Sequence, residues 1–201
     1  HAAAVAGAGM GRCAGEVGPP VATGGPKGKG YPGVGSDNYC SGDLVCYRVD
    51  DSDTETWQAI LGVNLMGPMF FIRAVGKHMQ VQGGGAIVNT ASVMGLVGGS
   101  RSPAYGATKH GVVGLTKTGA VDYAQEAIRI NAVCPGYIRT PMIEQGILSD
   151  PVAEERVVSR HPMHRLGTPE EIAEAVVWLC SDAASFVTGH AMTVDGGYVA
   201  W

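Results

Sequence analysis

The sequence has no cluster of basic residues, no long uninterrupted apolar run and no Cys-x-x-Cys pair. Its net charge is −4 and its lysines and arginines are spread along the chain, so the charge pattern does not favour nucleic acid as a partner. No apolar run approaches the roughly 18 residues that span a bilayer, so we expect no membrane partner. The alanine-rich start lacks a basic region followed by a hydrophobic stretch, and we therefore expect a cytoplasmic protein.

The cysteines and histidines give no metal-binding pattern. The five cysteines are an odd number, and their spacing favours neither a zinc site nor a redox pair. Cys134 and Cys180 fall in a predicted strand and a predicted helix, where a thiol acts as a small buried hydrophobe. His161 and His164 have a metal-like spacing, but no third ligand is evident and Pro162 breaks the helical face between them. We therefore expect no metal.

Composition divides the chain into two unequal parts. The length of 201 residues suits a single domain over 1–201, and 45% hydrophobic residues are enough for a folded core. Residues 1–47 are rich in glycine and proline, which weaken regular elements and interrupt central strands. Residues 48–201 instead contain apolar strands and segments of helical periodicity, so we expect the regular fold there.

The most informative segment is a buried strand that ends at a serine. The apolar run 86–91 leads into Ser92, which predicts a parallel strand with the serine at its carboxyl end. A glycine-rich loop follows, and then residues 104–125 carry apolar residues at helical spacing. A second strand is predicted over 128–134, where Pro135-Gly136 stops it. This order predicts an α/β fold with its polar groups at the carboxyl ends of a parallel sheet, where such sheets bind ligands.

Tyr105 and Lys109 are four residues apart, so they share one face of the predicted helix. A free phenol has a pKa of about 10, and a neighbouring ammonium favours the phenolate, so we expect Lys109 to lower the pKa of Tyr105. A phenol tuned in this way can pass a proton to or from an alcohol or ketone oxygen, which the Ser92 hydroxyl can hold in place. These groups suit hydride transfer with a nicotinamide.

Other segments complete the predicted pattern of elements. Residues 51–79 read as one long helix, in which Gly62, Gly67 and Pro68 imply either a bend or close packing. Residues 169–182 read as a helix, because Thr168-Pro-Glu-Glu171 combines a cap, a first-turn proline and acids. A final strand is expected over 190–194.

Residues 48–201 resemble the short-chain dehydrogenase/reductase family. The matching motifs stand in the family's order: Asn89-Thr-Ala-Ser92, Tyr105-Gly-Ala-Thr-Lys109, Arg129-Ile-Asn-Ala-Val133, Pro135-Gly136, Arg165-Leu-Gly-Thr-Pro-Glu-Glu-Ile172 and Val187-Thr-Gly-His-Ala-Met-Thr-Val-Asp-Gly-Gly197. Asn64, in Val63-Asn-Leu65, is similar to the family's helix asparagine. The resemblance implies a Rossmann-like, doubly wound parallel sheet, with the first βαβ half shortened or disrupted in this chain.

The resemblance also implies an NAD(P)-dependent oxidoreductase that interconverts a secondary alcohol and a ketone by hydride transfer. Asn64, Ser92, Tyr105 and Lys109 would form its catalytic tetrad. Tyr105 would be the general acid/base, Ser92 would position the substrate oxygen, and Lys109 would also hold the nicotinamide ribose. Asn64 would hold a water in a proton relay behind Lys109.

The resemblance further implies contacts to NAD or NADP and to a small alcohol or ketone. The expected cofactor contacts after the second strand are Pro135, Gly136, Ile138 and Thr140, in addition to Tyr105 and Lys109. Residues 138–168 would fold over the substrate as a lid. The candidate substrate contacts are Ser92, Met94, Tyr105, Gly136, Tyr137, Met142, His161 and His164, with ordinary loop packing as the alternative for the residues of the loops and the lid.

Two glycine clusters compete for the phosphate-binding loop. Gly7, Gly9 and Gly11 follow a strand-like lead over 2–6, which is the context that a pyrophosphate site requires, and we prefer this cluster. The segment 23–30 matches the family's glycine spacing, but it lacks a strand before it and a helix after it. The family's Asn-Asn-Ala-Gly segment is absent from the sequence. The residue that selects NAD or NADP cannot be located, so both cofactors stay open.

Related enzymes pair their long helices and last strand regions across two-fold axes, so the resemblance implies a homo-oligomer, either a dimer or a tetramer.

The alternative function is a catalytically silent subunit or interaction module, because residues 1–47 are too short for a complete cofactor-binding half. A hydrolase with Ser92 as nucleophile is disfavoured, since no Gly-x-Ser-x-Gly surrounds that serine.

Overall fold

The computed structural model of the protein describes residues 3–6, 47–145, 148 and 150–201. These residues form a four-stranded sheet in the order β1-β2-β3-β4, and every pair of neighbours is parallel. The strands are β1 (Ala3–Ala6), β2 (Gly85–Thr90), β3 (Ile128–Pro135) and β4 (Ala191–Val194). The parallel α/β sheet is confirmed, and so is the strand at the start of the chain, which pairs directly with β2.

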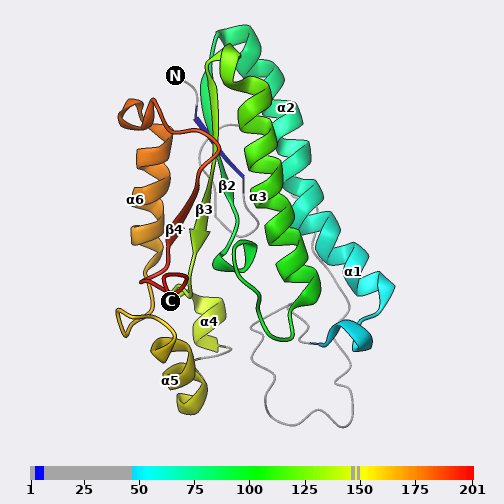
Figure 1. Ribbon diagram of the computed structural model, residues 1–201, viewed down its shortest axis with the longest axis vertical. Helices are drawn as coiled ribbons and strands as arrows, with labels where there is room; N and C mark the ends of the chain where they lie inside the picture. Colours follow the sequence, from blue (N-terminus) through cyan, green and yellow to red (C-terminus); the bar gives the residue numbers. More distant parts are fainter. Residues whose placement is uncertain (1–2, 7–46, 146–147, 149) are drawn as a thin grey trace.

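Helices cover both faces of the sheet (Figure 1). The helices α2 (Gly67–Gln82) and α3 (Pro103–Tyr123) lie on one face, and α6 (Pro169–Cys180) lies on the other. Along β2, Ile87 belongs to the core on the α2 side, while its neighbour Val88 packs with residues of α6. Both side chains are fully buried, which explains why this strand reads as a continuous apolar run.

The long amino-terminal helix is continuous but changes its winding in the middle. It begins with α1 (Thr54–Leu61), where the Asp53 carboxylate accepts a hydrogen bond from the Thr56 N–H at 2.7 Å. A π-helical segment, η2 (Gly62–Met66), joins α1 to α2. The predicted single helix over 51–79 is thus confirmed in outline, and the predicted irregularity takes the form of a π-helix. The helix ends at Gly83, whose φ of 85° is left-handed.

This helix also meets the length and composition of a membrane span. Over Thr54–Gln82, an 18-residue window has a mean hydropathy of 1.5, and 17% of that window is buried. The expectation that no apolar stretch approaches this length is therefore wrong for this helix, because its mean hydropathy stays high although single polar residues interrupt the apolar run. One such helix is weak support for a span, since apolar helices that pack against protein meet the same criterion.

Short helices lie near the carboxyl edge of the sheet: η3 (Val93–Gly95), α4 (Pro141–Gln145) and α5 (Pro151–Ser159). A further turn, η6 (Asp182–Ala184), follows α6. Two more 3-10 turns, η1 (Val49–Asp51) and η4 (Ala124–Glu126), precede α1 and follow α3.

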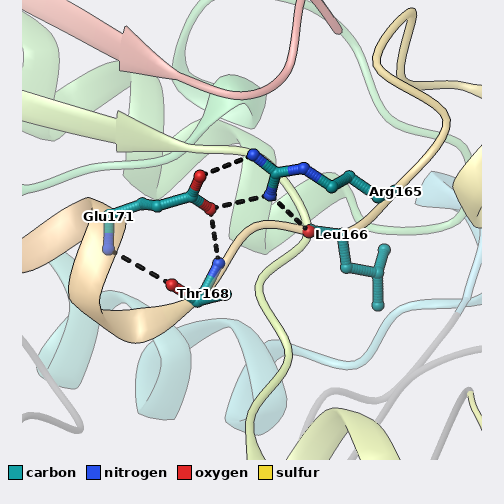
Figure 2. Close-up of polar contacts among 4 residues, drawn as sticks. All are labelled: Arg165, Leu166, Thr168 and Glu171. Atoms are coloured by element: carbon teal, nitrogen blue, oxygen red, sulfur yellow. Dashed lines mark hydrogen bonds and ion pairs between the residues drawn. The ribbon is translucent and has the colours of Figure 1, made fainter.

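The start of α6 is fixed by a capping box, which the sequence predicted. Thr168 Oγ1 accepts from the Glu171 N–H at 3.3 Å, and Glu171 Oε2 accepts from the Thr168 N–H at 2.9 Å. Arg165 donates to both oxygens of the same carboxylate, at 2.6 and 2.9 Å, as Figure 2 shows. These bonds lower the pKa of Glu171 to about 2.

Candidate active site

Ser92 lies at the carboxyl end of β2, where its side chain is 8% exposed. Its Oγ accepts a hydrogen bond from the Met94 N–H at 3.2 Å, which caps the short helix η3. The fold thus fixes the serine hydroxyl through the backbone that follows it. This placement at the carboxyl edge of the parallel sheet is the one that the sequence predicted.

Lys109 approaches the same edge from α3. Its side chain is 7% exposed, and Nζ donates at 3.0 Å to the carbonyl of Thr90, the last residue of β2. Burial lowers the pKa of Lys109 to about 8, partly offset by the nearby Cys134 thiol. The ammonium therefore keeps its charge at neutral pH, and it lies 5.4 Å from the centroid of the Tyr105 ring.

Tyr105 lies one helical turn before Lys109. Burial raises the pKa of Tyr105 above its ordinary value, and a hydrogen bond with the Ser92 side chain acts in the opposite direction. The expectation that Lys109 lowers this pKa is therefore wrong for the protein alone. The physical reason is that desolvation outweighs the favourable interactions of the phenolate, while the ammonium is bonded to Thr90 rather than to the phenol oxygen.

A close approach between η3 and α3 brings Ser92 near the helix. A Cβ at Gly95 would lie 2.7 Å from the Lys109 carbonyl oxygen, so only glycine fits without a shift of the backbone. The Gly95 N–H also donates to the Ser92 carbonyl at 2.8 Å. Gly95 therefore sets the spacing between the serine and the Tyr-x-x-x-Lys face of α3.

Asn64 is half-buried within the π-helical segment η2. This segment packs against α3, where a Cβ at Gly111 would lie 3.0 Å from Leu65 Cδ1. Among the described residues no hydrogen bond joins Asn64 to Lys109, so its role in a proton relay stays a prediction. A π-helical turn at this residue is itself notable, because such turns occur frequently at functional sites.

Cys134 is buried near Lys109 and Asp195, and sequence reasoning assigned neither Cys134 nor Asp195 to the site. Burial raises the pKa of Cys134 to about 11, so its thiol is neutral beside Lys109. The Asp195 carboxylate accepts from the N–H groups of Gly197 and Val199, both at 3.0 Å. The sequence Asp195-Gly-Gly197 could have predicted these hydrogen bonds of the carboxylate. An acid before two glycines is typical of a side chain that caps a turn.

The segment after β3 contains the expected cofactor contacts. Gly136 donates to the Val194 carbonyl at 3.1 Å, which joins Pro135-Gly136 to the end of β4. Ile138 forms a bridge with Gly167. Thr140 lies at the start of α4, where its Oγ1 accepts from the Ile143 N–H at 3.4 Å.

The candidate substrate contacts fall into different environments. His161 is 1% exposed and its ring nitrogens bond to protein atoms, so the expectation that it contacts substrate is wrong. Tyr137 is half-buried, and its charge interaction with Tyr105 places it near the tetrad. Met94 is half-buried against Gly99 and His164 is exposed, so a substrate contact from either one stays a prediction.

Several predicted residues lie outside the described part of the chain. These are Gly7, Gly9 and Gly11, the alternative glycine cluster at 23–30, and the side chain of Met142. Among the described residues, no group of three histidine, cysteine, aspartate or glutamate side chains could hold a metal ion.

The residues at this edge fit the nicotinamide end of a dinucleotide. An ammonium has three N–H donors, and within the described ranges Lys109 spends one of them, on the Thr90 carbonyl. In the same part of the chain Thr90 Oγ1 is buried without a hydrogen-bond partner. Unused polar groups beside a buried lysine suit a ligand that carries hydroxyl groups, such as a nicotinamide ribose.

Comparisons with known proteins agree with this geometry. A family model described as enoyl-(acyl carrier protein) reductase matches residues 43–199. The chain belongs to the short-chain dehydrogenase/reductase family. Cyclohexanol dehydrogenase of Acinetobacter sp. is 46% identical over 149 residues, which make up 74% of this chain and 57% of that protein.

Two other members of the family are informative. The structure of ElxO with NADP bound has a TM-score of 0.75 and 39% identity, and the match covers 79% of this chain and 64% of that one. A protein of Xanthobacter autotrophicus, named inactive 2-(S)-hydroxypropyl-CoM dehydrogenase 2, is 42% identical over 76% of this chain and 67% of its own length. The chain thus spans less than two thirds of both cyclohexanol dehydrogenase and ElxO.

Proposed function

We propose that this chain is an NAD(P)-dependent oxidoreductase that interconverts a secondary alcohol and a ketone by hydride transfer. The observation that carries the proposal is the group of Ser92, Tyr105 and Lys109 at the carboxyl edge of the sheet, where the serine and the lysine are buried and the tyrosine is half-buried. The Ser92 side chain favours the phenolate form of Tyr105, and the ammonium lies over the phenol ring. Two hydroxyl groups at one point can hold a single substrate oxygen between them.

The raised pKa of Tyr105 assigns its protonation state at the start of the reaction. At neutral pH the phenol keeps its proton, so it can donate that proton to a ketone oxygen as the carbonyl carbon is reduced. In the opposite direction, the phenolate accepts the proton of the alcohol. A bound nicotinamide supplies the hydride or accepts it.

Lys109 supports this chemistry through charge and position. Its ammonium is tied to the Thr90 carbonyl, so the cation is held at a fixed place beneath the tyrosine ring. Tyr105, Lys109 and the segment from Pro135 to Thr140 would hold the nicotinamide half of the cofactor. The phosphate-binding end, expected at Gly7, Gly9 and Gly11, would complete the site.

Support for NADP comes from ElxO, which holds NADP and shares this fold. Support for a small secondary alcohol comes from cyclohexanol dehydrogenase, and cyclohexanol is therefore the first substrate to test. Purified protein would be titrated with NADPH and with NADH, read by fluorescence transfer from its tryptophans. Turnover of cyclohexanol with the matching oxidised cofactor would then be measured.

The second candidate function is a catalytically silent subunit of the same fold. The Xanthobacter relative, whose name says that it is inactive, favours this function. The titration separates the two functions. A dissociation constant in the micromolar range for either cofactor supports the oxidoreductase, and no binding at millimolar concentration supports the silent subunit.

We also propose that the chain forms a homo-oligomer through its long helices. The side chains of Val63, Phe70 and Val81 on the long helix are exposed, as is Val121 on α3. An apolar helix face of this kind is expected to pack against protein. Sedimentation analysis of the purified chain tests this, because a monomer at micromolar concentration would contradict it.

A further inference from the structure

His161 makes two hydrogen bonds that together determine its tautomer. Its Nδ1 lies 2.9 Å from the Val157 carbonyl oxygen, which can only accept a hydrogen bond. Its Nε2 lies 3.2 Å from the Tyr137 nitrogen, whose N–H can only donate. These partners place a proton on Nδ1 and a lone pair on Nε2.

The acceptor nitrogen of His161 holds the chain where it leaves β3. A Cβ at Gly136 would lie 2.9 Å from His161 Nε2 and 3.0 Å from Asp195 Cα, so the histidine and the Asp195 turn enclose this glycine from two sides. The next residue, Tyr137, donates its N–H to the histidine ring. His161 thus fixes the backbone at the residues that are expected to face the nicotinamide.

Aromatic packing joins the same histidine to the carboxyl-terminal turn. The Tyr137 and His161 rings are 5.8 Å apart and nearly perpendicular, and the His161 and Tyr198 rings are 5.3 Å apart. A backbone hydrogen bond joins the same two regions, because the Met163 N–H donates to the Gly196 carbonyl at 3.1 Å. Three segments therefore meet at one ring: the end of β3, the end of α5 and the turn after β4.

Tyr137 brings this junction within range of a charge interaction with Tyr105. Burial is the main cause that raises the pKa of Tyr137, and its interactions with Tyr198 and Tyr105 add to the shift. The charged side chains that border the junction are already engaged. Asp195 accepts from two backbone N–H groups, and Arg160 donates to the Tyr198 hydroxyl at 3.4 Å.

We propose that His161 is a positioning residue that keeps Gly136 and Tyr137 in place for cofactor and substrate, and that it acts only as the Nδ1–H tautomer. Protonation of Nε2 would set two N–H donors against each other, because Tyr137 can only donate there. The proposal rests on the proposed oxidoreductase function, since it concerns the nicotinamide end of that site.

Two variants separate this role from simple packing. In His161→Gln, the side-chain oxygen is as many bonds from Cβ as Nε2 is, so it can accept from the Tyr137 N–H without titrating. In His161→Asn, the amide matches Nδ1 instead, and the Tyr137 N–H loses its acceptor. At pH 7.5 we expect the Asn variant to raise KM for the reduced cofactor or the ketone by about tenfold, and the Gln variant by less than about twofold.

Equal impairment of the Gln and Asn variants would show that the ring only fills space, and would overturn the proposal. An unchanged KM in the Asn variant would overturn it as well.

Long-range proton–nitrogen NMR of the ring tests the tautomer without any turnover. The expected spectrum has a protonated Nδ1 and an unprotonated Nε2 for His161, assigned by its absence in the Gln variant. The opposite tautomer would contradict the proposal. If the wild type shows the expected tautomer but binds neither NADPH nor NADH, then the proposed function fails, and with it the claim that His161 positions a cofactor segment.

Discussion

The ammonium of Lys109 lies 5.4 Å from the centroid of the Tyr105 ring, while its hydrogen bond goes to the Thr90 carbonyl at 3.0 Å. The cation therefore borders the face of the phenol rather than its oxygen. Desolvation then controls the titration of Tyr105 in the protein alone, and its pKa lies above the ordinary value. The sequence pattern predicted that a cation beside the phenol would lower the pKa of Tyr105. The structure has the cation beside the ring, but the pKa of Tyr105 is raised.

The titration of Tyr105 can be followed by the ultraviolet absorbance of phenolate. The difference between the wild type and Tyr105→Phe isolates this residue from the other tyrosines. In the protein without cofactor, we expect the Tyr105 step above pH 10, because burial disfavours the phenolate. Addition of NADP⁺ should move the step to lower pH, since a positive nicotinamide favours a nearby anion. A step below pH 10 without cofactor would contradict the structure.

Lys109 makes stability depend on pH in a definite direction. Its pKa is lowered from 10.5 to about 8 in the folded chain, so between these values the unfolded chain binds a proton that the folded chain does not. The contribution of Lys109 to the free energy of unfolding therefore rises with pH across this window. Below about pH 8 the folded chain carries the full cost of holding a buried ammonium.

The comparison is between the wild type and Lys109→Met, which removes the ionisable group but keeps the length of the side chain. The stability of the wild type relative to this variant should increase from pH 8 to pH 10 and approach a total change of about 3 kcal/mol near pH 10.5. Urea unfolding at several pH values measures it. A constant difference across the window would show that the lysine pKa is not lowered.

Gly95→Ala tests the close approach of η3 and α3. The added Cβ would lie 2.7 Å from the Lys109 carbonyl oxygen, so one backbone must move. We expect a loss of about 1–3 kcal/mol in unfolding free energy and a lower kcat, because Ser92 and the helix face separate. Gly98→Ala is the matched control in the same loop, since a Cβ there meets nothing within 4 Å. If both variants lost equal unfolding free energy and equal kcat, Gly95 would not set the spacing between Ser92 and α3.

Local patterns predicted the elements that depend on nearby residues. The apolar run before Ser92 became β2, and the motif at Thr168 became a complete capping box. Both rest on short-range rules, namely burial of a strand on two faces and satisfaction of the first helical N–H groups. The strand ahead of Gly7 was predictable for the same reason.

Features that depend on distant residues could not be predicted in this way. His161 seemed free to contact substrate because its donor partner, the Tyr137 N–H, is 24 residues away. The pKa of Tyr105 was misjudged because desolvation is a property of the whole fold and not of one helix turn. The π-helical turn around Asn64 was indicated only as a bend, since glycine and proline signal an irregularity but not its type.

Tyr105→Phe tests the central claim most directly, because it removes one hydroxyl and leaves a ring of the same shape. Tyr123→Phe, at the far end of the same helix, is the matched control. With NADPH and the ketone of the substrate that the wild type turns over, we expect Tyr105→Phe to lower kcat by at least about a hundredfold. Its affinity for NADPH and its unfolding temperature should stay near those of the wild type. A Tyr105→Phe variant with full turnover would contradict the assignment of this phenol as the proton donor.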